Sequence, residues 1–133
     1  MTSKIDAIQA DQRNIEITCN TGFALYAGTS LRWVAQTFQE SWQKEGAIAL
    51  ATKIHNQAVA TLDKNKQMIV LDLPISELYQ MAVALKLLAD SKMKKGALDK
   101  THLATKAEAR RGYDMIRDTL SEYGYDVDSI LLS

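Results

Sequence analysis

Two histidines and a single cysteine are the side chains of this sequence best suited to metal binding or nucleophilic catalysis. His55 and His102 lie far apart in the chain, and neither has a second ligand at helical or hairpin spacing. We interpret His55 as a hydrogen-bonded residue at the boundary of the core and His102 as a solvated residue at a helix start. Cys19 alternates with Ile15 and Ile17, a pattern typical of a buried, unreactive thiol. We therefore expect no metal and no cofactor.

Pairs of carboxylates can work as general acid and base, and the sequence contains Glu40 with Glu45 and Asp114 with Asp118. No pattern around either pair indicates a pocket, so we interpret all four as solvent-exposed. Residues 126–128 resemble the start of a calcium loop but lack its third carboxylate and its glycine. The six glycines match neither common nucleotide-binding pattern. The sequence thus predicts a protein that is not an enzyme, and an enzyme or small-ligand binder whose pocket no motif marks stays an alternative.

Basic residues are concentrated between positions 92 and 117, where eight lysines and arginines stand against three acidic residues. They are Lys92, Lys94, Lys95, Lys100, Lys106, Arg110, Arg111 and Arg117. Only acidic charges follow, so the last predicted helix carries its charges in the order opposite to that favoured by the helix dipole. Such a segment could bind phosphates, which makes a small nucleic-acid-binding regulator an alternative function. Against it, the connection before this helix is too long for a helix-turn-helix, and aromatic residues are not interleaved with the cations.

Apolar side chains beyond those needed for one core predict a surface for protein partners. The expected helix 75–93 is apolar nearly all round, with a second ridge formed by Tyr79, Val83 and Leu87. Trp33 stands opposite the apolar stripe of its own helix, and an apolar cluster ends the sequence. The candidate interaction residues are Trp33, Tyr79, Val83, Leu87, Val127, Ile130, Leu131 and Leu132. They favour a non-catalytic protein-interaction module that acts as a homo-oligomer, an adaptor or an inhibitor-like regulator.

The elements expected to position these residues form an α+β fold dominated by helices. Residues 15–27 alternate between apolar and polar side chains around a turn at Asn20-Thr21-Gly22, which predicts a β-hairpin. A third strand is expected at 67–72, where a short β-branched run suits burial on both faces. Apolar periodicity predicts helices at 30–45, 46–62, 75–93 and 101–123. A break near Gly46 is favoured because an unbroken helix over 31–62 would be about 48 Å long, too long for a compact domain.

The 133 residues, 47% hydrophobic and 24% charged, are expected to form a single globular domain, with 125–133 as a candidate docking tail. Sixteen basic and sixteen acidic residues give a formal net charge of zero, so no overall field attracts nucleic acid or anionic lipid. A single cysteine favours a reducing compartment, and no apolar run is long enough for a signal peptide or a membrane span. We therefore expect a cytoplasmic protein that binds protein partners or itself and no membrane.

Overall fold

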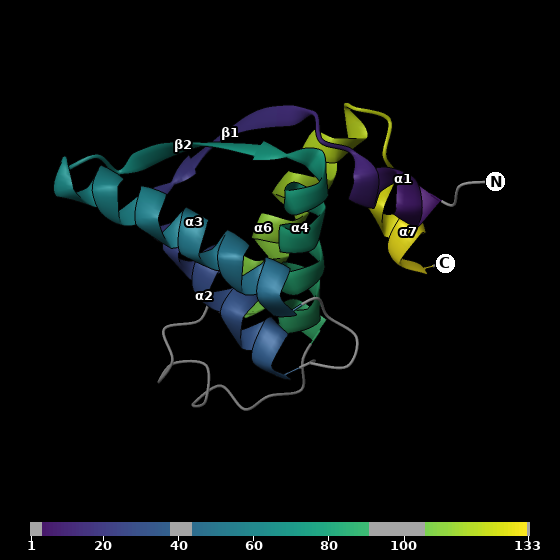
Figure 1. Cartoon of the computed structure of the whole chain (residues 1–133), viewed down its shortest axis with the longest axis horizontal. Helices are drawn as coiled ribbons and strands as arrows, with labels where there is room; N and C mark the ends of the chain where they lie inside the picture. Colours follow the sequence, from purple (N-terminus) through teal and green to yellow (C-terminus); the bar gives the residue numbers. More distant parts are fainter. Residues whose placement is uncertain (1–3, 38–43, 91–105, 133) are drawn as a thin grey trace.

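The computed structural model of the chain describes residues 4–37, 44–90 and 106–132. This part of the chain contains six helices and two strands. The two strands form a small sheet that lies across a layer of helices (Figure 1). The elements are α1 (Lys4–Ala10), β1 (Asn14–Asn20), α2 (Thr21–Thr37), α3 (Lys44–Asp63), β2 (Met68–Pro74), α4 (Ile75–Asp90), α6 (Lys106–Ser121) and α7 (Val127–Leu132). The predicted α+β fold dominated by helices is confirmed.

The sheet consists of β1 and β2, which pair antiparallel with Ile17 opposite Leu71. Side chains alternate between buried and exposed along both strands, as expected when one face of a sheet packs on a core. The buried face carries Ile15, Ile17, Cys19, Ile69, Leu71 and Leu73. Cys19 is thus the small core residue that the sequence predicts, and desolvation raises the pKa of its thiol to about 11. The thiol is protonated at neutral pH, which makes it a poor nucleophile.

The predicted hairpin at 15–27 is wrong in its second half, because the chain after β1 turns directly into α2. The Asn20 side chain caps this helix, since its Oδ1 accepts a hydrogen bond of 2.7 Å from the backbone N–H of Gly22. The N–H of Thr21 donates to the carbonyl of Gln67, which ties the helix start to the segment before β2. The three residues interpreted as a hairpin turn are therefore a helix start, and β2 is the strand that pairs with β1.

Helices α2 and α3 lie side by side beneath the sheet (Figure 1). They approach closely at Gly28, where a Cβ atom would lie 3.2 Å from the carbonyl oxygen of Ala51. The prediction that residues 31–62 do not form one continuous helix is confirmed, because α2 and α3 lie side by side as separate helices. The helix break expected near Gly46 is not at that residue, because Gly46 lies inside α3.

Helix α4 stands at the centre of the molecule, between the α2 and α3 pair and the short helices α1 and α7 (Figure 1). It begins immediately after Pro74 ends β2, and α6 packs along it. Its buried side chains are Ile75, Leu78, Tyr79, Met81, Ala82, Ala84, Leu85 and Leu88. The predicted helix 75–93 is confirmed over 75–90, and the predicted helix 101–123 over 106–121, while 91–93 and 101–105 lie outside the described residues.

Two short helices, α1 and α7, were not predicted from the sequence, and polar contacts link the segments next to them. The hydroxyl of Tyr125 donates to Oδ2 of Asp11 at 2.6 Å, and Arg13 forms an ion pair with the same carboxylate at 2.8 Å. The hydrogen bonds from Arg13 and then from Tyr125 hold the pKa of Asp11 well below its usual range. The first and last helices lie at the same side of the molecule (Figure 1), and the Tyr125–Asp11 hydrogen bond joins the segments next to them.

Replacing Asn20 by alanine removes the side chain that caps α2. We expect the free energy of unfolding, measured by urea denaturation, to fall by about 0.5–2 kcal/mol. Asn14→Ala is the matched control, because Asn14 is exposed at the other end of β1. The control should change the free energy by less than about 0.5 kcal/mol. Equal losses in the two variants would contradict the capping role of Asn20.

Candidate functional site

The outer face of the sheet carries large apolar side chains that are exposed. Helices α2, α3 and α4 lie on the inner side of the sheet (Figure 1). Met68 and Val70 on β2 are 53% and 54% exposed, the highest values among the large hydrophobic residues described. Asn20 and Thr18 stand opposite them on β1 and are exposed as well. The prediction that the strand at 67–72 is buried on both faces is therefore wrong, because the described part of the chain has helices to cover only one.

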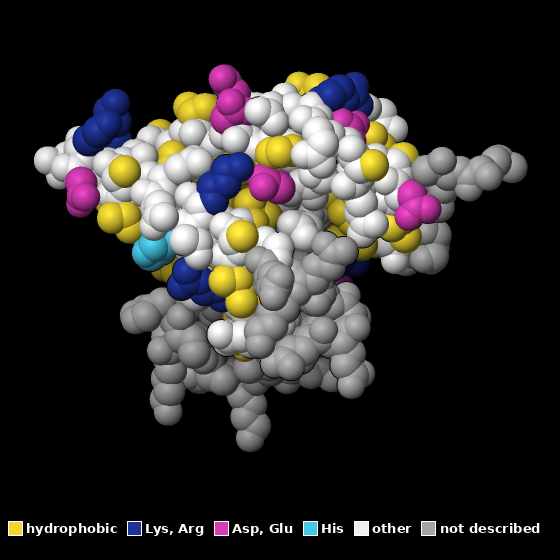
Figure 2. Space-filling model, viewed as in Figure 1, with side chains coloured by type: hydrophobic (Ala, Val, Ile, Leu, Met, Phe, Trp, Pro, Cys, Tyr) yellow, Lys and Arg dark blue, Asp and Glu magenta, His cyan; other side chains and the backbone are white. Residues whose placement is uncertain are grey.

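Charged side chains flank this apolar area at both ends. Glu16 on β1 faces Asp72 on β2, and like charges placed directly opposite each other repel. At the other end, the turn after Asp63 holds Lys64 and Lys66. Glu16, Asp72 and the two lysines form no ion pair with any residue that the structure describes. Figure 2 shows a basic group at the end of the molecule that holds this turn.

We define the outer sheet surface as an apolar centre with an acidic and a basic end. The centre consists of Thr18, Asn20, Met68 and Val70, the acidic end of Glu16 and Asp72, and the basic end of Lys64 and Lys66. This surface was not predicted from the sequence, because the expected hairpin at 15–27 gave β1 a different partner. The sequence feature that indicates this surface is the apolar run at residues 68–71 in β2. No charged side chain interrupts this run, so both faces of the strand are apolar before Asp72.

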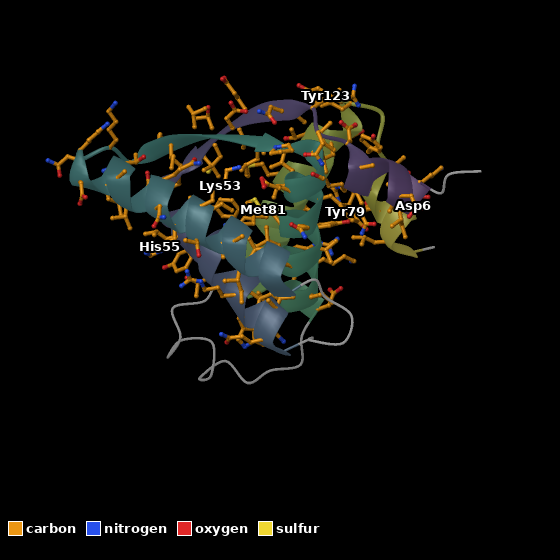
Figure 3. All side chains as sticks on the ribbon, viewed as in Figure 1. Asp6, Lys53, His55, Tyr79, Met81 and Tyr123 are labelled. Carbon is orange, nitrogen blue, oxygen red and sulfur yellow. The ribbon has the colours of Figure 1, made fainter. Side chains whose placement is uncertain are left out.

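The second ridge of α4 is not an exposed surface, because α1 packs on that side of the helix. Tyr79 is only 5% exposed and lies on the side of α4 that faces α1 (Figure 3). Ile8 of α1 is fully buried, and Val83 and Leu87 are partly buried against the core. The expectation that Tyr79 awaits a partner is therefore wrong, while for the partly buried Val83 and Leu87 it stays a prediction. Self-association of the chain also stays a prediction.

The C-terminal tail belongs to the core. Val127 is fully buried and Ile130 is 1% exposed, while Leu131 is partly buried against the core. Leu132 ends α7, and its side chain lies outside the described residues. Trp33 also packs, partly buried, against the core. The proposed docking residues Val127 and Ile130 are therefore covered by the chain itself, because α7 folds back on the helices instead of extending.

Acidic residues of the chain itself surround much of the described basic segment. Arg110 and Arg117 both pair with Asp114, at 3.5 and 3.0 Å, and Arg117 also lies 3.5 Å from Asp128 of α7. Both guanidinium groups lie over the ring of Tyr113, whose hydroxyl donates to Asp128. Asp128 of α7 thus contacts two side chains of α6, Tyr113 and Arg117.

The other cations of the basic segment fall into two groups. Lys106 and Arg111 are exposed and form no ion pair with a described residue. Lys92, Lys94, Lys95 and Lys100 lie outside the described residues. Nucleic-acid binding by 92–117 stays a prediction.

The residues first examined for catalysis and metal binding do not come together in the described part of the chain. His55 is exposed on α3 (Figure 3) and makes no hydrogen bond with a described residue, so its interpretation as a hydrogen-bonded boundary residue is wrong. Asp126 caps α7 by accepting a hydrogen bond from the N–H of Ser129, which explains the acidic residues at 126–128. Among the described residues, no three His, Cys, Asp or Glu side chains are placed to hold a metal ion. His102, Glu40 and the side chain of Glu45 lie outside them.

Comparisons with known proteins give no match, whether with family models, curated proteins or solved structures. None of the helices in the described ranges has the length and apolar character needed to cross a membrane.

Truncating Ile130 to alanine tests whether α7 belongs to the core. We expect the free energy of unfolding to fall by about 2–5 kcal/mol in urea denaturation, because the buried side chain leaves a cavity. Leu131→Ala removes a side chain of similar size from the next position, which is only partly buried, and should cost clearly less. If both variants are as stable as the wild type, α7 is not a core element.

Proposed function

We propose that the protein is a non-catalytic protein-interaction module that self-associates through its outer sheet surface. One observation carries this proposal: β2 has apolar side chains on both faces, and the described residues cover only one of them. An exposed apolar strand is a template for association, which proteins usually block with charges or prolines. Between Met68 and Leu71 no such blocking residue occurs.

The arrangement of charges favours a second copy of the chain as the partner. Along the strands, the apolar centre separates the acidic pair Glu16 and Asp72 from the basic turn with Lys64 and Lys66. A two-fold axis through the centre would place the acidic end of one copy against the basic end of the other. Contacts of this kind are isologous, so one surface is sufficient for both partners. The four charges, which lack ion pairs among the described residues, would then gain partners.

The size of the surface predicts that this association is weak and reversible. Two paired strands of seven residues cover an area about 23 Å long and about 10 Å wide. This is roughly a quarter of the ~800 Å² per partner buried in a standard stable interface. Exposed ion pairs at its ends are screened by salt, so the association should weaken as ionic strength rises.

The described residues offer less support for nucleic-acid binding or for catalysis. Two of the four described cations of the basic segment, Arg110 and Arg117, are already in ion pairs, which reduces the charge available to phosphates. Catalysis would need a group of reactive side chains, but Cys19 is protonated in the core and His55 makes no hydrogen bond or ion pair with a described residue.

Val70→Lys tests the proposed surface, because a second copy would have to desolvate the introduced charge. In light scattering the wild-type protein should have an average mass above 14.8 kDa at millimolar concentration and approach that mass on dilution. The V70K variant should stay at the monomer mass throughout. The matched control is Val59→Lys, the same change at an exposed position of α3, which should behave like the wild type.

Two outcomes would contradict the proposed function. The wild-type protein could stay monomeric at the highest concentration reached, or V59K could lose association as completely as V70K. The V70K variant should fold, since a lysine is well tolerated on an exposed strand. Circular dichroism of the three proteins checks that both variants are folded.

A further inference from the structure

A cleft of about 360 Å³ opens where the end of β1 meets the first turns of α2 and the first half of α6. Its volume lies within the range of about 300–1,000 Å³ typical of small-molecule sites. Apart from Asn20 at its edge, it shares no residue with the outer sheet surface. The cleft is thus a separate feature of the molecule.

Apolar side chains form the walls of this cleft. Phe23 and Tyr26 come from successive turns of α2, and Met115 comes from α6. The Phe23 ring reaches the backbone of α6 at Gly112, where a Cβ atom would clash with the ring. The ring is therefore held against the backbone of α6, and the apolar wall exists before a ligand arrives. Preformed walls of this kind reduce the entropy lost on binding.

The charge offered to a ligand comes from Arg111. This side chain is exposed, lines the cleft and has no ion pair with a described residue. Arg110 and Arg117 on the same helix differ from it, because Asp114 pairs with both. Glu108 also lines the cleft, but it already interacts with another residue of the chain. An apolar cleft with one available guanidinium at its rim fits an amphipathic anion.

We propose that this cleft binds a small organic carboxylate with an aromatic or branched aliphatic body. The body packs between Phe23, Tyr26 and Met115, where aromatic rings and a polarisable sulfur favour an aromatic ring. The guanidinium of Arg111 donates two parallel N–H···O bonds to the carboxylate, a geometry that arginine provides and lysine does not. A free organic acid and the C-terminus of a peptide that ends in an apolar residue share this chemistry.

Amide NMR spectra of the full chain, titrated with 3-phenylpropionate, test the proposal. The backbone signals of Gly22 and Gly112 report directly on the cleft, because both glycines line it. Both signals should shift saturably at millimolar concentrations of the acid. The uncharged analogue 3-phenylpropionamide should bind at least about tenfold more weakly. A tripeptide ending in phenylalanine, with a free or an amidated C-terminus, distinguishes the two sources of the carboxylate.

Arg111→Gln should weaken binding of 3-phenylpropionate by about tenfold or more, since a hydrogen-bonded charge pair is lost. Arg110→Gln is the matched control, an adjacent exposed arginine outside the cleft, and should bind like the wild type. Binding of the acid alone assigns the site to small molecules, and binding of the free peptide terminus alone assigns it to peptides. The proposal is overturned if neither carboxylate shifts the two glycine signals, if acid and amide bind equally, or if R111Q binds as the wild type does.

Discussion

Burial of helix α4 is the constraint on which the rest of the fold depends. Its apolar side chains point in nearly all directions, and each large one gains roughly 1.5–3 kcal/mol when it leaves water. A helix of this kind needs neighbours all round, and α1, α2, α6 and β2 each contact it. The sheet covers the end where α4 begins, and α6 packs along its length. The elements of the chain are thus largely committed to covering α4, which leaves no described helix for the outer face of β2.

The short helices at both ends of the described chain illustrate how marginal elements are held. Helices of six or seven residues are too short to be stable alone in water, so α1 and α7 depend on tertiary contacts. Ile8 and Ile130 supply apolar anchors, and Tyr125 links the two segments through Asp11. Ionised Asp11 is favoured by its hydrogen bonds, so this contribution is present above the ordinary carboxyl pKa and is lost as the pH falls through its lowered value.

The sequence predicted the helices and strands better than it predicted which of them contact each other. Long periodic helices and the strand at β2 were identifiable because their apolar patterns extend over many residues. The hairpin error arose because Phe23, Leu25 and Ala27 alternate like a strand, while the capping hydrogen bond of Asn20 decides for a helix. Burial of Tyr79 and Ile130 depends on α1 and α7, whose patterns are too short to recognise. The outer sheet surface and the cleft both depend on which distant segments meet, which periodicity does not encode.

We propose that the outer sheet surface is self-complementary, with its acidic end facing the basic end of a second copy. Sedimentation velocity on two charge-reversal variants tests it most directly. The double variant Lys64→Glu with Lys66→Glu places like charges at both ends and should weaken self-association. Adding Glu16→Lys and Asp72→Lys reverses both ends and should restore much of it. If the variant with all four changes associates no better than the variant with Glu at positions 64 and 66, or if the latter associates as strongly as the wild type, the surface is not self-complementary.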